Sequence, residues 1–194
     1  HTRNDVLRRM KQLFRWAKST DRIPVDLTDW IPAVEGSAPL RVAPDMTAVE
    51  RLIEVAKTSG PRDMAIIAVF LGTGIRRAEA SALDVTDVTL YADLSGTLAV
   101  RKAKRVRNRA VHARMVAFDA ATGHYLAAWL DHLPPAGPLF PTSHIDREGE
   151  RLTPAGVYKV VRRIVDDAGL GNVIQGPHDL RRLFATTFAR HRRG

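Results

Sequence analysis

An uninterrupted apolar segment, residues 64–71, constrains the fold of this chain more than any other feature of its sequence. We interpret it as a buried helix, because no polar face is left for contact with water. Gly60 and Pro61 break the chain before the segment, and Thr73 and Gly74 end it. With 194 residues, 45% of them apolar, the chain can bury such a helix in one domain accompanied by a fragment of a second.

Helical spacing of apolar residues recurs along most of the chain. We expect further helices at 5–17, from 47 to the break at 60, in a short stretch that ends at 83, and at 120–133, 153–169 and 178–190. The stretches 97–101 and 107–112 alternate around a basic run, which predicts a small antiparallel sheet with a charged hairpin tip. Prolines punctuate residues 23–44 and predict an extended linker. The expected fold class is mainly α with a small antiparallel β-sheet (α+β).

Basic residues gather in three parts of the chain. The sequence has 30 Lys and Arg against 21 Asp and Glu, which gives a formal net charge of +9. The excess lies within 3–18, 101–114 and 181–193, and the last two stretches contain no acidic residue. Such clustering favours a nucleic-acid partner, although solvated helix faces and tails also carry runs of charge.

Composition excludes several classes of protein. The chain has no cysteine, so disulfide frameworks and cysteine-based zinc sites are excluded. No apolar run approaches the roughly 20 residues that span a bilayer, and the N-terminal sequence lacks a signal-peptide core. We therefore expect a soluble cytosolic or nucleoid protein without a membrane partner.

The segment from Thr73 to Glu79 combines a glycine, two arginines and a glutamate. Gly74 lets the backbone approach a ligand closely. Arg76 is expected in the first turn of the next helix, where exposed N–H groups favour an anion. Glu79 lies three residues later and can orient Arg76. The alternative is an ordinary turn between helices with surface arginines.

Two further motifs suit phosphate chemistry. The basic run 101–109 can enter a DNA groove, and a lysine there can give up a proton when neighbouring cations lower its pKa. From chemistry alone, a loop that only supplies charge is the favoured interpretation. His178 and Arg181 are three residues apart, so they share one face at the start of a helix. Taken alone, this spacing favours a histidine without a chemical role.

The chain resembles the catalytic domain of the tyrosine recombinases, the phage-integrase and Xer family. The resemblance rests on three motifs in the order of that family: the Thr-Gly-Ile-Arg-Arg-Ala-Glu turn, the lysine hairpin and His-Asp-Leu-Arg-Arg. The resemblance covers nearly the whole chain. It implies the fold of DNA breaking-rejoining enzymes. Residues 1–22 would form the last helix of an N-terminal core-binding domain, 23–46 a linker, and 47–194 a catalytic domain truncated before its nucleophile.

The resemblance implies a site-specific recombinase or integrase that cleaves and rejoins DNA through a 3′-phosphotyrosyl intermediate, without a metal or nucleotide cofactor. Arg76 and Arg181 would clamp the scissile phosphate. Lys104 would protonate the departing 5′ oxygen, His178 would assist proton transfer, and Glu79 would be a supporting residue. The residues expected to contact DNA are Arg8, Arg15, Arg77, Arg101, Lys102, Arg105, Arg107, Arg109 and Arg182.

The family places its nucleophilic tyrosine downstream of the His-x-x-Arg motif, whereas Tyr91, Tyr125 and Tyr158 all precede that motif. We therefore expect the nucleophile beyond Gly194, so that this fragment binds double-stranded DNA without cleaving it. The full-length protein would act as a homotetramer on DNA, encoded by a bacterial chromosome, a phage or another mobile element. Two alternatives stay open: a non-catalytic DNA-binding module with the same fold, and an enzyme similar to the type IB topoisomerases.

Overall fold

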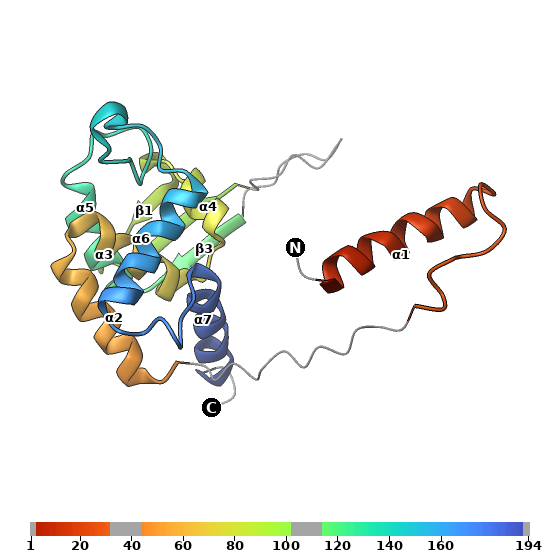
Figure 1. Ribbon diagram of the computed structural model, residues 1–194. Helices are drawn as coiled ribbons and strands as arrows, with labels where there is room; N and C mark the ends of the chain where they lie inside the picture. Colours follow the sequence, from red (N-terminus) through yellow and green to blue (C-terminus); the bar gives the residue numbers. More distant parts are fainter. Residues whose placement is uncertain (1–2, 32–43, 102–113, 192–194) are drawn as a thin grey trace. The chain divides into compact units, whose positions relative to one another are not determined.

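The computed structural model describes residues 3–31, 44–101 and 114–191 (Figure 1). The chain divides into two compact units, His1–Leu40 and Arg41–Gly194. The first unit consists of helix α1, Arg3–Ser19, and the turns that follow it. This helix confirms the one that the sequence predicts at 5–17.

The described part of the predicted linker is not extended. Residues 23–31 form turns, and the carbonyl of Ile31 accepts a hydrogen bond of 3.0 Å from Nζ of Lys11 in α1. The buried carboxylate of Asp26 accepts hydrogen bonds from the N–H and the hydroxyl of Thr28, at 2.9 and 2.6 Å. A short side chain that bonds nearby backbone in this way stabilises a turn, which the proline content alone did not indicate.

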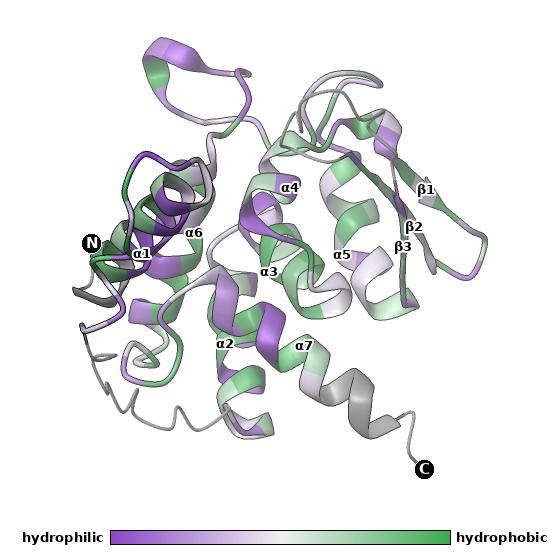
Figure 2. Cartoon of the chain, turned by 90° about the vertical axis from the view of Figure 1, so that its right-hand side faces the viewer, coloured by the Kyte–Doolittle hydropathy of each residue, from purple (hydrophilic) through white to green (hydrophobic). Residues whose placement is uncertain are grey.

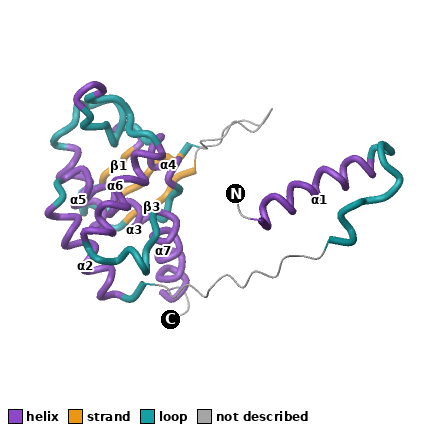
Figure 3. The backbone as a smooth tube through the Cα atoms, viewed as in Figure 1, coloured by secondary structure: helices purple, strands orange, loops and turns teal. Residues whose placement is uncertain are grey.

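The second unit is mainly helical and contains one three-stranded sheet (Figure 3). Its elements in chain order are α2 (Met46–Thr58), α3 (Pro61–Thr73), α4 (Arg77–Ala82), the 3₁₀ turn η1 (Val85–Asp87), β1 (Val88–Leu90), β2 (Gly96–Val100), β3 (Arg114–Phe118), α5 (Ala120–Leu130), the 3₁₀ turn η2 (Ile145–Arg147), α6 (Pro154–Asp167) and α7 (Pro177–His191). The predicted fold class is confirmed.

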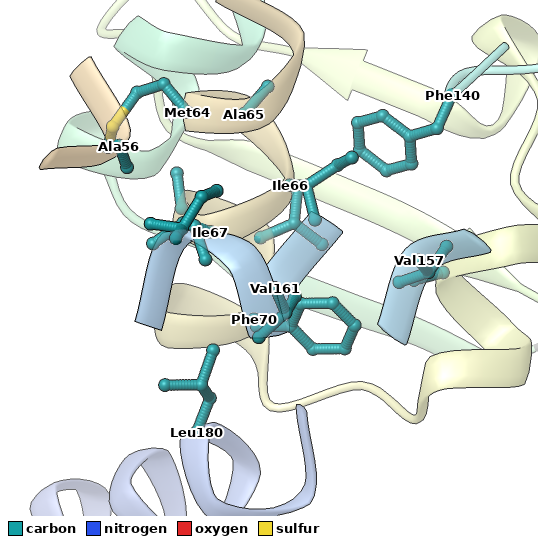
Figure 4. Close-up of a cluster of buried hydrophobic side chains, with 14 of the residues drawn as sticks. Ala56, Met64, Ala65, Ile66, Ile67, Phe70, Phe140, Val157, Val161 and Leu180 are labelled. Atoms are coloured by element: carbon teal, nitrogen blue, oxygen red, sulfur yellow. The ribbon is translucent and has the colours of Figure 1, made fainter. Parts of the chain in front are cut away.

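Helix α3 lies at the centre of this unit, as its apolar sequence predicts. Ile67, Val69 and Phe70 have no exposed surface. Figure 4 shows side chains of α3 among those of α6 and α7, with Val161 beside Phe70. The helix begins at Pro61 and not at residue 64, because a proline at the first helical position lacks only an N–H that would have no partner there.

The sheet is antiparallel in the order β1-β2-β3, with Val88 opposite Leu98 and Val100 opposite Arg114. Strand β2 confirms the prediction at 97–101, and Leu98 and Val100 bury their side chains in the core. The second predicted strand, 107–112, lies outside the described residues; the strand that follows β2 in the chain and pairs with it is β3, 114–118. Figure 2 shows the sheet and α6 on opposite sides of α3.

Side-chain caps mark the starts of α2 and α6, where the sequence predicts them. Asp45 caps α2 by accepting a hydrogen bond from the N–H of Ala48 at 2.8 Å. Thr153 caps α6 by accepting one from the N–H of Gly156 at 3.1 Å. Helix α5 ends at Leu130, three residues before the predicted end at 133.

Candidate active site

The turn between α3 and α4 is built around Gly74. This residue ends α3 in the left-handed conformation, with φ +57°, and its N–H donates to the carbonyl of Phe70 at 3.1 Å. Any other residue would be strained there. A Cβ at position 74 would also lie 2.4 Å from Cδ1 of Phe184 in α7. We expected Gly74 to let a ligand approach the backbone closely. In the structure, the group that lies close to Gly74 is the Phe184 ring of α7.

The sequence predicted Arg76 in the first turn of α4, and this prediction was wrong: Arg76 is the N-cap residue that precedes the helix. Its backbone N–H donates to Oε2 of Glu79 at 2.7 Å, and its guanidinium Nη1 donates to Oε1 at 3.0 Å. The Glu79 side chain is only 5% exposed, whereas that of Arg76 is 64% exposed. The predicted orienting contact is therefore present, with the carboxylate buried and the guanidinium directed to solvent.

Arg114, at the start of β3, shares the carboxylate of Glu79. Its Nη1 and Nη2 donate to Oε1 and Oε2 at 2.8 and 2.9 Å, a bidentate pair. Burial alone would raise the pKa of Glu79, but the hydrogen bonds from Arg114 and Arg76 lower it from 4.5 to about 2. Sequence reasoning missed Arg114. The sequence marks Arg114 only as the last member of the basic stretch 101–114, with nothing that points to Glu79.

The start of α7 supplies the second half of the site. The guanidinium of Arg181 donates to the carbonyl of Gly74, which ties α7 to the α3–α4 turn. Asp179 is buried and accepts a hydrogen bond of 2.8 Å from the N–H of Gln175, closing the loop that leads into the helix. His178 is exposed. At the start of α7, Asp179 and Leu180 therefore face the core and His178 faces solvent.

These two segments meet around a cavity of about 710 Å³. Its lining residues come from the α3–α4 turn, from α6 and from the start of α7: Ile75, Arg76, Arg77, Ala78, Tyr158, Gln175, Gly176, Pro177, His178, Asp179 and Arg181. The cavity brings together three of the predicted catalytic residues, Arg76, His178 and Arg181. Lys104 lies outside the described residues.

The residues predicted to contact DNA fall into different environments. Arg77 lines the cavity, and Arg8 is exposed on α1. Three others face carboxylates: Arg101 donates to Asp87 at 2.6 Å, Arg182 lies 3.8 Å from Asp179, and Arg15 lies 4.0 Å from Asp26. Lys102, Arg105, Arg107 and Arg109 lie outside the described residues. Sequence reasoning missed the acidic partner of Arg101, which comes from η1.

Chemically, three guanidinium groups and an imidazole around one cavity suit an oxyanion with several oxygens. Arginine donates hydrogen bonds in a planar fork that matches phosphate, and it keeps its charge at all physiological pH values. Histidine can carry a proton near neutral pH. Across the described ranges, no group of three or more His, Asp or Glu side chains is arranged to hold a metal ion.

The model of the phage integrase family matches residues 45–193. The chain belongs to this family. The chain is also 29% identical over 181 residues to the tyrosine recombinase XerC of Herpetosiphon aurantiacus, a match that covers 91% of this chain and 56% of XerC. It therefore spans about half the length of such curated relatives.

Solved structures agree with this assignment. The integrase domain matches the XerH site-specific recombinase bound to its palindromic difH substrate in a post-cleavage complex, with 26% identity and a TM-score of 0.65. The match covers 86% of this chain and 48% of XerH. The Tn1549 transposon integrase, in complex with circular intermediate DNA, has a TM-score of 0.73 at 16% identity, over 97% of this chain and 66% of that one. The latter shows the fold alone. Within the described ranges, no helix is long and apolar enough to cross a membrane.

Proposed function

We propose that the integrase domain is part of a site-specific recombinase that cleaves and rejoins double-stranded DNA through a 3′-phosphotyrosyl intermediate. The cavity that joins Arg76, His178 and Arg181 carries this proposal. Its donors suit a phosphodiester, and the similar XerH was solved on its difH substrate. The parent protein would act as a homotetramer on DNA in the bacterial cytoplasm, and a chromosome, phage or mobile element would encode it.

In this proposal Arg76 and Arg181 bind the non-bridging oxygens of the scissile phosphate. They stabilise the charge that develops when a tyrosine oxygen attacks phosphorus and the bond to the 5′ oxygen breaks. His178 assists removal of the proton from the attacking hydroxyl, and Lys104 protonates the departing 5′ oxygen. Rejoining reverses these steps. Glu79 and Arg114 position Arg76 and do not touch the phosphate.

We place the nucleophilic tyrosine outside residues 1–194. Tyr91 is 51% exposed, outside the cavity, and Tyr125 is half-buried in α5. Tyr158 does line the cavity, but it precedes the His-x-x-Arg motif, and its ring packs beside Arg77. On this proposal the chain alone binds duplex DNA and leaves it intact.

The test uses the full-length parent protein and a nicked suicide duplex that bears its recombination site. We expect a covalent protein–DNA adduct, resolved on a denaturing gel. Arg76→Ala or Arg181→Ala should slow adduct formation about 100-fold or more. Lys104→Ala should slow cleavage far more than it weakens binding, with the neighbouring Lys102→Ala as the matched control. An unmodified parent that binds the site without forming an adduct would favour the non-catalytic module.

A further inference from the structure

Arg77 and Tyr158 form a pair on the wall of the cavity, and this pair has no role in the proposed reaction. The guanidinium carbon of Arg77 lies 5.7 Å from the centroid of the Tyr158 ring, within the range of a cation–π contact. Arg77 is the first residue of α4, whereas Tyr158 belongs to α6. The contact therefore holds a side chain of the α3–α4 turn against a different helix.

The Tyr158 ring is itself held by the loop before α7. A Cβ at position 176 would lie 2.8 Å from Cε2 of Tyr158, so glycine at this position lets the ring pack closely against the loop backbone. The ring nevertheless stays 39% exposed. It thus offers a rigid aromatic surface inside an open cavity.

Arg77 differs from Arg76 in its charge environment. Glu79 neutralises Arg76, but across the described parts of the chain Arg77 makes no ion pair with a carboxylate. Its contact with the ring involves the planar face of the guanidinium and leaves the N–H groups at the edge available to an anion. Arg77 is exposed in the cavity, so its guanidinium can bind an anionic ligand without first breaking an ion pair within the part of the protein that the structure describes.

We propose that Tyr158 is a positioning residue that holds Arg77 in place to bind a second DNA phosphate, beside the phosphate assigned to Arg76 and Arg181. The inference rests on the proposed function. Duplex DNA carries one negative charge per about 1.7 Å of helix axis, so a site that holds one phosphate has others within reach. The ring spares Arg77 the conformational entropy that a free side chain would lose on binding.

The test is a titration of residues 1–194 with a fluorescent duplex of arbitrary sequence at several salt concentrations. Arg77→Ala should weaken binding about tenfold and reduce the slope of log K against log salt by about 0.9, the value for one lost phosphate contact. Tyr158→Ala should weaken binding about threefold, and Tyr158→Phe should match the unmodified chain because it keeps the ring. Tyr91→Ala, at an exposed tyrosine outside the cavity, is the matched control and should change nothing.

A double-mutant cycle decides between positioning and a separate contact. The Arg77→Ala/Tyr158→Ala variant should bind no more weakly than Arg77→Ala alone, because the ring acts only through the guanidinium. Additive losses, or a Tyr158→Phe variant as weak as Tyr158→Ala, would overturn the inference. Tyr158→Leu replaces Tyr158→Ala if thermal unfolding shows that the alanine variant is not folded. Failure of the unmodified chain to bind duplex DNA would overturn the proposed function as well.

Discussion

The starts of α4 and α7 each direct an arginine into the cavity, but they hold it in different ways. Arg76 is held by the buried carboxylate of Glu79, which Arg114 shares. Arg181 is held by a backbone carbonyl, that of Gly74. The first arrangement depends on a group that can be protonated, whereas the second depends only on α7 being packed against the turn. The phosphate clamp that we propose therefore combines electrostatic positioning of Arg76 with positioning of Arg181 by the fold.

Replacing Glu79 by glutamine should have the largest effect, because it removes the charge from the first arrangement and keeps its shape. Arg114 and Arg76 then lose their shared counter-ion. Breaking a fully buried ion pair by changing one partner costs about 3–5 kcal/mol. Here the carboxylate is buried but both guanidinium groups are partly exposed, so we expect a loss at the lower end, about 3 kcal/mol, in the free energy of unfolding measured with urea. The matched control is Glu54→Gln. This residue forms an exposed ion pair with Lys57 at 2.7 Å, and its loss should cost less than about 1 kcal/mol. Equal losses in the two variants would contradict the electrostatic account.

Acid should weaken the contact between Arg76 and Glu79 and leave the contact between Arg181 and the Gly74 carbonyl unchanged. The pKa of Glu79 is lowered in the folded protein from 4.5 to about 2, so its stabilising effect is complete above pH 4.5 and is lost as the pH falls toward 2. The effect amounts to about 3 kcal/mol. We therefore expect the stability difference between the unmodified chain and Glu79→Gln to shrink across this range in urea titrations. A difference that stays constant down to about pH 2 would show that the charge of Glu79 is not what stabilises it.

Gly74→Ala tests the second arrangement and should have the smallest of these effects. It places a Cβ 2.4 Å from the ring of Phe184 in a left-handed turn. Strain and crowding of this kind cost about 1–3 kcal/mol, measured as a loss of unfolding free energy. Gly60→Ala is the control, since its φ is also positive but no atom lies within 4 Å of the added Cβ. A loss no larger than that of the control would show that α7 tolerates displacement from the turn.

The half of the site contributed by α7 was the more predictable from sequence. His178 and Arg181 share a face because three residues make nearly one helical turn, and Pro177 marks the helix start. The pairing of Glu79 with Arg76 follows from the same local spacing. These contacts lie within one short segment, so they do not depend on how distant parts of the chain pack.

The residues that sequence reasoning missed all depend on tertiary arrangement. Arg114 reaches Glu79 only because the register of the sheet places it opposite Val100, and the sequence before Arg114 gives no local sign of that register. Tyr158 enters the cavity only because α6 packs against α4. Arg101 bonds Asp87 across the edge of the sheet for a similar reason.

The contact at the peptide group of Gly74 makes the arrangement of the cavity depend on whether α7 is docked. The Gly74 carbonyl stands at the end of α3 and accepts a hydrogen bond from the guanidinium of Arg181 in α7, so a single contact ties Arg181 to the turn that leads to Arg76. If α7 detaches, Arg76, Glu79 and Arg114 keep their mutual contacts while Arg181 departs. Partial opening of this helix, which costs less free energy than global unfolding, would then switch off phosphate binding while the core around α3 stays intact.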